Sequence, residues 1–259
     1  MSVAHIRHTN IFYLTEGNPA HPAILFSNSL GTDHRMWQAQ AEHLRERFYV
    51  IRYDTRGHGG SASPAGPYSL QQLAEDALGL LDFLGIATAH FCGLSMGGVT
   101  GQWLGIHAAG RISKLILANT AAKVGDSTAW QQRADMVRTN GLGSIADSAA
   151  SRWFTPDFVS RMPDQVSALT EHLRQENPSG YAACCEALAS ADLRQQIHAI
   201  TPQTLIIAGN ADPVTTVADA VFMQQQIPDA RIAVLEASHI SNIEAESAFN
   251  QALLAFLSD

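Results

Sequence analysis

Ser95, with Gly93 and Gly97 two residues away on either side, is the strongest chemical signal in this chain. The short apolar run 89–92 predicts a strand before it, and residues 98–109 predict a helix after it. Glycines let a strand and a helix pass closely, because they lack a Cβ atom, and a serine on so sharp a turn has a strained backbone. The pattern predicts a nucleophile exposed at a strand end; the alternative is a glycine-rich turn with an ordinary serine.

A serine hydroxyl is a weak nucleophile, so it needs a base and a group that orients the base. Asp212 follows the predicted strand 204–208, and His239 follows the predicted strand 230–235. Active sites of open α/β sheets gather at the carboxyl ends of strands, so we predict His239 as the base and Asp212 as its orienting group. One alternative base and two alternative orienting residues stay open: His58, Glu236 and Asp219.

Acyl transfer also needs hydrogen-bond donors for the oxyanion that develops on the carbonyl oxygen. One predicted donor is the backbone N–H of Met96, directly after the serine, and the other is that of Leu30, in the loop after the predicted strand 23–27. Leu30 is the favoured residue within the loop 28–31, and a residue directly next to it is the alternative. Both residues are expected to act through their amides.

The segment 54–59 combines Asp54, Arg56 and His58 in a tight glycine-rich turn and resembles a second catalytic cluster. We favour a structural interpretation, in which Asp54 and Arg56 hydrogen-bond the loop backbone and brace the serine turn.

These residues require an α/β fold to bring them together. Strand patterns alternate with helical ones, which predicts a mostly parallel sheet flanked by helices. The clearest helix is 70–84, where Ser69 and Gln72 form a capping box. Strand signals vanish over 121–196, which predicts a helical cap on a core made of 1–120 and 197–259. The remaining predicted strands are 11–15, 49–53 and 114–118.

Composition excludes several classes of function. The 259 residues are 46% hydrophobic and carry a formal charge of −8, with Lys114 and Lys123 the only lysines, so nucleic acid is not an expected partner. The sequence has no apolar run of ~18 residues and no leader pattern, so no membrane insertion is expected. Three cysteines, two of them adjacent, make no disulfide framework, which favours the reducing cytoplasm. Histidines are scattered and no dinucleotide fingerprint occurs, so we expect neither a metal nor a cofactor.

The sequence resembles the α/β-hydrolase superfamily over nearly its whole length and, more narrowly, the 3-oxoadipate enol-lactonases. The serine turn and the order Ser95, Asp212, His239 specify only the superfamily. The narrower likeness rests on stretches 26–32 (FSNSLGT), 52–60 (RYDTRGHGG), 91–98 (FCGLSMGG), 117–122 (LANTAA), 153–156 (WFTP), 184–185 (CC), 208–213 (AGNADP) and 238–242 (SHISN). The resemblance implies the α/β-hydrolase fold with a cap inserted after the sixth strand, and the same three catalytic residues.

The substrate that this resemblance implies is a small anionic five-membered enol lactone with a carboxymethyl arm, hydrolysed to 3-oxoadipate. A chain of negative charge needs a local cation for that arm. Four arginines of the cap are candidates: Arg133, Arg138, Arg152 and Arg161. Three aromatic residues are expected in the substrate pocket or in the core of the cap: Trp130, Trp153 and Phe154.

Other functions remain open at this stage. A broad carboxylesterase or a cofactor-free haloperoxidase-like hydrolase would use the same three catalytic residues, and a ligand receptor on this fold would lack repeated turnover. The sequence does not indicate the oligomeric state.

Overall fold

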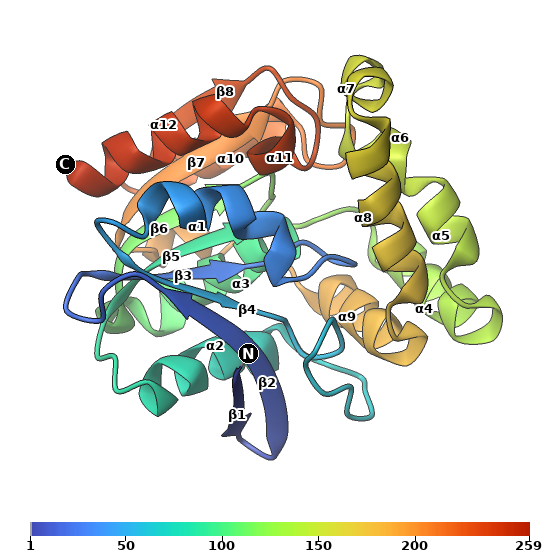
Figure 1. Ribbon diagram of the computed structural model, residues 1–259, viewed down its shortest axis with the longest axis horizontal. Helices are drawn as coiled ribbons and strands as arrows, with labels where there is room; N and C mark the ends of the chain where they lie inside the picture. The colour runs from blue at the N-terminus through green and yellow to red at the C-terminus, as the bar shows by residue number, and fades with distance from the viewer. Residues whose placement is uncertain (1) are drawn as a thin grey trace.

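The computed structural model describes residues 2–259, in which eight strands form one sheet in the order β1-β2-β4-β3-β5-β6-β7-β8 (Figure 1). β1 pairs with β2, and β2 with β4, in antiparallel fashion; every later pairing is parallel. The prediction of a mostly parallel α/β fold is confirmed. The strands are β1 (Ser2–Ile6), β2 (Thr9–Glu16), β3 (Ala23–Ser27), β4 (Tyr49–Tyr53), β5 (Ala89–Leu94), β6 (Ile112–Ala118), β7 (Gln203–Gly209) and β8 (Arg231–Leu235).

The central strands are buried on both faces. All five residues of β3 are buried, as are the last four of β5 and of β6. Strands of a sheet that is covered on both sides need such continuous apolar runs. These runs are the reason that the strands could be predicted from the sequence. β1 was not predicted, because this edge strand mixes polar residues with an exposed valine, Val3.

Helices cover both faces of the sheet. α1 packs against α12, and α2 packs against α3 on the opposite face (Figure 1). The capping box is present: the Ser69 hydroxyl accepts from the Gln72 amide, and the Gln72 side chain accepts from the Ser69 amide. The core helices are α1 (Gln38–Leu44), α2 (Leu70–Phe83), α3 (Met96–His107), α10 (Val217–Gln226), α11 (Ser241–Glu244) and α12 (Glu246–Ser258), with short 3-10 helices η1 (His34–Trp37), η2 (Ala109–Arg111) and η3 (Ile197–Ala199).

The chain between β6 and β7 is helical and gathers on one side of the molecule (Figure 1). The α-helices of this chain segment lie within the range 121–196 that the sequence sets apart as a cap, and η3 follows that range. Its helices are α4 (Ser127–Asn140), α5 (Gly143–Asp147), α6 (Ala149–Trp153), α7 (Pro156–Arg161), α8 (Pro163–Gln175) and α9 (Pro178–Ser190).

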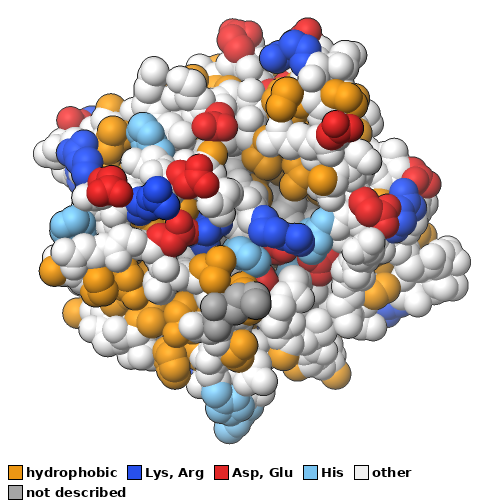
Figure 2. All heavy atoms as spheres, in the orientation of Figure 1, with side chains coloured by type: hydrophobic (Ala, Val, Ile, Leu, Met, Phe, Trp, Pro, Cys, Tyr) orange, Lys and Arg blue, Asp and Glu red, His pale blue; other side chains and the backbone are white. Residues whose placement is uncertain are grey.

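Charge is dispersed on one face of the molecule. Figure 2 shows acidic and basic side chains interspersed on the face in view, without a single basic patch. Within residues 2–259, no helix has the length and apolar content needed to cross a membrane.

Candidate active site

Ser95 lies on the turn between β5 and α3, with φ at +55°, a region that residues with side chains rarely adopt. The turn depends on two glycines. A Cβ atom on Gly93 would lie 2.1 Å from the carbonyl oxygen of Gly97, and one on Gly97 would lie 2.2 Å from that of Ser27. The glycines therefore allow the close approach of strand and helix that the sequence predicts.

The structure brings Ser95, His239 and Asp212 together. Nε2 of His239 lies 2.9 Å from Oγ of Ser95, and Nδ1 of His239 lies 2.8 Å from Oδ2 of Asp212. All three residues are buried, with 3–6% of their surface exposed. They follow the carboxyl ends of β5, β8 and β7, so the topology of the sheet explains their meeting.

The Asp212 carboxylate is held from several sides. Oδ1 accepts from the amides of Val214 and Thr215 at 2.8 and 3.1 Å, and Oδ2 accepts from the Thr215 hydroxyl and from Nδ2 of Asn119 at 2.8 and 3.0 Å. Burial raises the pKa of Asp212, but the bonds from His239, Asn119 and Thr215 outweigh it and leave the pKa below its ordinary value. Asp212 is therefore a carboxylate at neutral pH.

The loop that carries His239 is fixed to the cap. The Glu244 carboxylate accepts from the backbone amides of Ser238 and Thr155 at 2.7 and 3.0 Å. The amide of Ile240 donates to the carbonyl of Trp153 at 3.0 Å. Contacts on both sides of His239 thus set the position of its ring relative to α6.

The two predicted oxyanion donors come from the start of α3 and from the loop after β3. Met96 begins α3, and Leu30 lines the cavity in front of Ser95. Among the hydrogen bonds of residues 2–259, none uses the amide of Leu30 or of Met96. Asn28 connects the two elements, because its carbonyl accepts from the Gly97 amide at 3.1 Å. Both amides are therefore available to a ligand.

A cavity of about 260 Å³ opens in front of Ser95 and His239, between the core and the cap. Of the predicted aromatic residues, Trp130 and Trp153 line it. Phe154 does not, so it is not supported as a substrate-binding candidate; it takes the other expected place, in the core of the cap, where it is 1% exposed and stacks on Phe158. Consecutive side chains at the end of a helix point in different directions, so Trp153 lines the cavity while Phe154 packs inside the cap.

Two of the four candidate arginines, Arg133 and Arg152, line the cavity. Within residues 2–259, no carboxylate lies within 4.0 Å of either guanidinium. Arg133 stacks over the ring of Trp130 at 4.9 Å. Burial lowers the pKa of Arg152, and the nearby charge of Arg133 lowers it further. The cavity thus holds two positive charges that repel each other. An anion bound between them would reduce this repulsion.

Arg138 and Arg161 lie elsewhere. Arg138 pairs with Glu186 at 2.7 Å, and Arg161 pairs with Asp157 at 2.8 Å. Neither lines the cavity, and Arg161 is 61% exposed. Their ion pairs fit the ordinary role of surface arginines on helices.

The alternative residues for base and orienting group have partners other than Ser95 and His239. His58 bonds the amide of Gly31 through Nε2. Glu236 accepts from the side chain of Asn210, and Asp219 caps α10. The geometry therefore favours His239 and Asp212.

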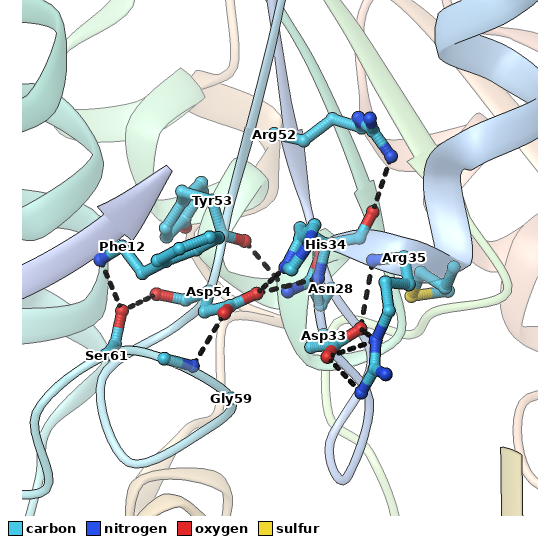
Figure 3. Close-up of polar contacts among 12 residues, drawn as sticks. Phe12, Asn28, Asp33, His34, Arg35, Arg52, Tyr53, Asp54, Gly59 and Ser61 are labelled. Atoms are coloured by element: carbon cyan, nitrogen blue, oxygen red, sulfur yellow. Dashed lines mark hydrogen bonds and ion pairs between the residues drawn. The ribbon is translucent and has the colours of Figure 1, made fainter. Parts of the chain in front are cut away.

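Asp54 braces loops, as the structural interpretation of the segment 54–59 expects. Its carboxylate accepts from the amides of His34 and Gly60 at 2.7 and 2.8 Å, and its carbonyl accepts from the Ser61 hydroxyl (Figure 3). Arg56 instead forms two hydrogen bonds with Asp76 of α2, at 2.5 and 2.6 Å, and does not bond the loop backbone. That part of the interpretation is wrong, because the guanidinium points toward the helix.

Carboxylates and imidazoles that are far apart in the sequence form a cluster beside this segment. Two groups, Asp33 with His172 and Glu176, and Asp33 with His34 and Asp54, have ligand atoms close enough for one cation. These side chains already bond one another: His172 lies 2.7 Å from Glu176, and His34 lies 2.7 Å from Asp54. Since His172 and Glu176 belong to the cap, the cluster joins the cap to the core.

Comparison with known proteins identifies the family. The family model for the alpha/beta hydrolase fold matches residues 22–246. This chain belongs to the α/β-hydrolase family. The chain is 53% identical to 3-oxoadipate enol-lactonase 2 of Acinetobacter baylyi, across 95% of its own length and 92% of that protein's. It is 47% identical to 3-oxoadipate enol-lactonase 1 of the same organism, across 91% and 88%.

Solved structures agree with this assignment. The enol-lactonase from Burkholderia xenovorans superposes with a TM-score of 0.98 at 43% identity, and each chain is covered completely. A thermophilic esterase from Thermogutta terrifontis superposes with a TM-score of 0.92 at 26% identity, over 96% of this chain and 93% of that one. The predicted resemblance is confirmed, and the chain is an ester hydrolase.

Proposed function

We propose that this protein hydrolyses 3-oxoadipate enol-lactone to 3-oxoadipate through an acyl-enzyme on Ser95. The relatives at 47% and 53% identity carry that activity in their names. The observation that carries the proposal for this chain is the placement of two arginines without carboxylate partners in the cavity that Ser95 faces.

The first step opens the lactone ring. Oγ of Ser95 attacks the ring carbonyl while Nε2 of His239, at 2.9 Å, accepts the hydroxyl proton. Asp212 bonds Nδ1 of the same ring, so it fixes the tautomer and stabilises the imidazolium that forms. The amides of Leu30 and Met96 donate to the oxyanion of the tetrahedral intermediate.

Collapse of that intermediate breaks the bond between the carbonyl carbon and the ring oxygen. The leaving group is an enolate, which takes the proton from His239 and becomes a ketone. It is a good leaving group because its charge is delocalised. The product of this half-reaction is an open chain that is esterified to Ser95.

The second step releases the product. Water gives a proton to His239 and attacks the ester carbonyl; the ester bond to Ser95 breaks, and Oγ takes the proton back. The product carries two carboxylates. Arg133 and Arg152 are proposed to hold the arm that carries the carboxylate already present in the substrate, which positions the lactone carbonyl at Ser95.

Comparison of the enol-lactone with its methyl ester tests this assignment, because the ester keeps the ring and loses the charge of the arm. We expect kcat/KM for the charged lactone to exceed that for the methyl ester by about 100-fold, a value typical of a lost interaction between a buried cation and a carboxylate. Equal values, or faster hydrolysis of p-nitrophenyl acetate than of the lactone, would contradict the assignment and favour a broad esterase.

A further inference from the structure

His58 is buried, with 1% of its surface exposed, and takes no part in the proposed proton transfers. Its Nε2 lies 2.9 Å from the backbone nitrogen of Gly31. An amide N–H can only donate, so Nε2 must be the acceptor and carry no proton. The contact therefore fixes His58 as a neutral ring with its proton on Nδ1.

The surroundings of the ring agree with this tautomer. Nδ1 faces the carbonyl of Arg56 at 3.5 Å and the sulfur of Cys184 at 3.9 Å. Burial lowers the pKa of His58, and the negative charges of Glu176 and Asp54 oppose that effect only in part. The neutral ring can therefore accept the hydrogen bond at neutral pH.

Gly31 occupies the turn that follows Leu30. The amide of Thr32 donates to the carbonyl of Ser29 at 3.2 Å, which closes the turn, and φ of Gly31 is +80°. A Cβ atom on Gly31 would lie 2.6 Å from Cδ1 of Leu173 in the cap. The turn is confined between core and cap, and its central peptide joins Leu30 to Gly31.

Other contacts fix the start of this loop but not that peptide. The side chain of Asn28 donates to the carbonyl of Tyr53 at 2.8 Å (Figure 3) and accepts from Trp37 at 3.0 Å. For the peptide between Leu30 and Gly31, the bond to His58 supplies the partner of the N–H group. Without it that N–H would be buried and unpaired, which costs about 1–3 kcal/mol and favours rotation of the peptide.

We propose that His58 is a positioning residue for the oxyanion hole: its Nε2 holds the N–H group of Gly31 and so fixes the turn 29–32, including the preceding peptide between Ser29 and Leu30, whose N–H group then faces the carbonyl attacked by Ser95. This inference rests on the proposed function, because the Leu30 amide acts only if acyl transfer takes place on Ser95. Loss of the bond to Gly31 raises the energy of the tetrahedral intermediate and leaves ground-state binding by the arginines intact.

Two substitutions of similar shape separate acceptance of the hydrogen bond from packing. His58→Gln keeps an oxygen that can accept from Gly31, whereas His58→Met fills a similar volume with only a weak acceptor. We expect His58→Met to lower kcat for the enol-lactone by about 10- to 100-fold, less than deletion of a complete oxyanion donor. The inhibition constant of the product 3-oxoadipate should stay within about twofold of the wild type, and His58→Gln should restore kcat to within about fivefold.

A merely structural role would give other results. Equal loss of kcat in both variants, or a loss of product affinity that matches the loss of kcat, would overturn the proposal. Nitrogen-15 NMR of histidine-labelled protein provides a second measurement that does not depend on a variant folding. The proposal requires the Nε2 resonance of His58 to be that of an unprotonated nitrogen, and a protonated Nε2 would overturn it.

The assay also separates this inference from the proposed substrate. If the wild type hydrolyses p-nitrophenyl acetate but not the enol-lactone, the substrate assignment fails, and the comparison of His58→Met with His58→Gln is made on kcat for the acetate. If the wild type hydrolyses neither ester, both proposals fail, because no oxyanion forms for the Leu30 amide to stabilise.

Discussion

Asn119 donates a hydrogen bond of 3.0 Å to Oδ2 of Asp212, the same oxygen that lies 2.8 Å from Nδ1 of His239. The same amide group donates to the carbonyl of Ser238, directly before His239, at 3.1 Å. Its oxygen accepts from the Ser241 hydroxyl at 2.5 Å. Asn119 therefore fixes both the carboxylate and the loop that carries the imidazole.

Replacement of this amide should impair the catalytic step. We expect Asn119→Ala to lower kcat by about 10- to 100-fold with little change in KM, because a hydrogen bond to a charged group contributes about 1.5–3 kcal/mol. Thr215→Val is the matched control: it removes another hydrogen-bond donor to Asp212 but keeps the bond from Asn119 to the loop that carries His239. Steady-state kinetics should show a smaller loss in the control, and an equal or larger loss there would contradict the dual role of Asn119.

The charge of Asp212 is a separate prediction. Asp212→Asn keeps the shape of the side chain but stabilises the wrong tautomer of His239, so kcat should fall by about 10⁴-fold. Circular dichroism and the melting temperature should show a folded protein. A loss below about tenfold would mean that another carboxylate orients the ring.

The arginines of the cavity should govern KM. We expect Arg133→Gln and Arg152→Gln each to raise KM for the enol-lactone by about 10- to 100-fold, while kcat changes by less than about threefold. Arg138→Gln and Arg161→Gln are matched controls from the same cap, because their partners are Glu186 and Asp157. Similar effects of all four substitutions would show that net charge, and not the cavity, attracts the substrate.

The stability of the protein should depend on pH through His58. Unfolded chains protonate histidine near pH 6.5, whereas burial lowers the pKa of His58 in the folded protein. The unfolded state thus binds more protons as the pH falls below that value, and the free energy of unfolding decreases. This contribution is present above the unfolded pKa and is lost toward acid.

Urea denaturation at about pH 7.5 and about pH 5 measures this effect. His58→Gln should reduce the difference in unfolding free energy between the two pH values. The reduction is at most about 2 kcal/mol, because about 1.5 pH units separate pH 5 from the unfolded pKa and each unit corresponds to about 1.4 kcal/mol. The other titratable groups near the ring, Glu176, Asp54 and His172, remain in the variant. The same pH dependence in both proteins would show that His58 is not the group responsible.

Sequence reasoning located Ser95, Asp212 and His239 because each follows a strand whose apolar run is easily recognised, and parallel strands end at one edge of the sheet. It did not find Asn119 or Thr215, whose roles depend on partners far away in the chain. A polar residue directly after β6 was nevertheless a usable signal for Asn119, since β6 is adjacent to β5 in the sheet.

The cap was harder to interpret than the core. Helical periodicity identified the segment but not which side of each helix faces Ser95, so Arg133 and Arg152 could not be separated from Arg138 and Arg161. For the same reason Trp153 and Phe154 were treated alike, although only Trp153 lines the cavity. Such distinctions arise from how short helices pack together, and pattern alone does not contain that information.

Hydrolysis of 3-oxoadipate enol-lactone, followed by its ultraviolet absorbance with the wild type and with Ser95→Ala, tests both the substrate and the nucleophile. We expect many turnovers per molecule of the wild type, and a loss of at least about 10⁴-fold in kcat for a folded Ser95→Ala protein. A wild type that leaves the lactone intact would rule out the substrate, and a Ser95→Ala variant that still hydrolyses it rapidly would rule out Ser95 as the nucleophile.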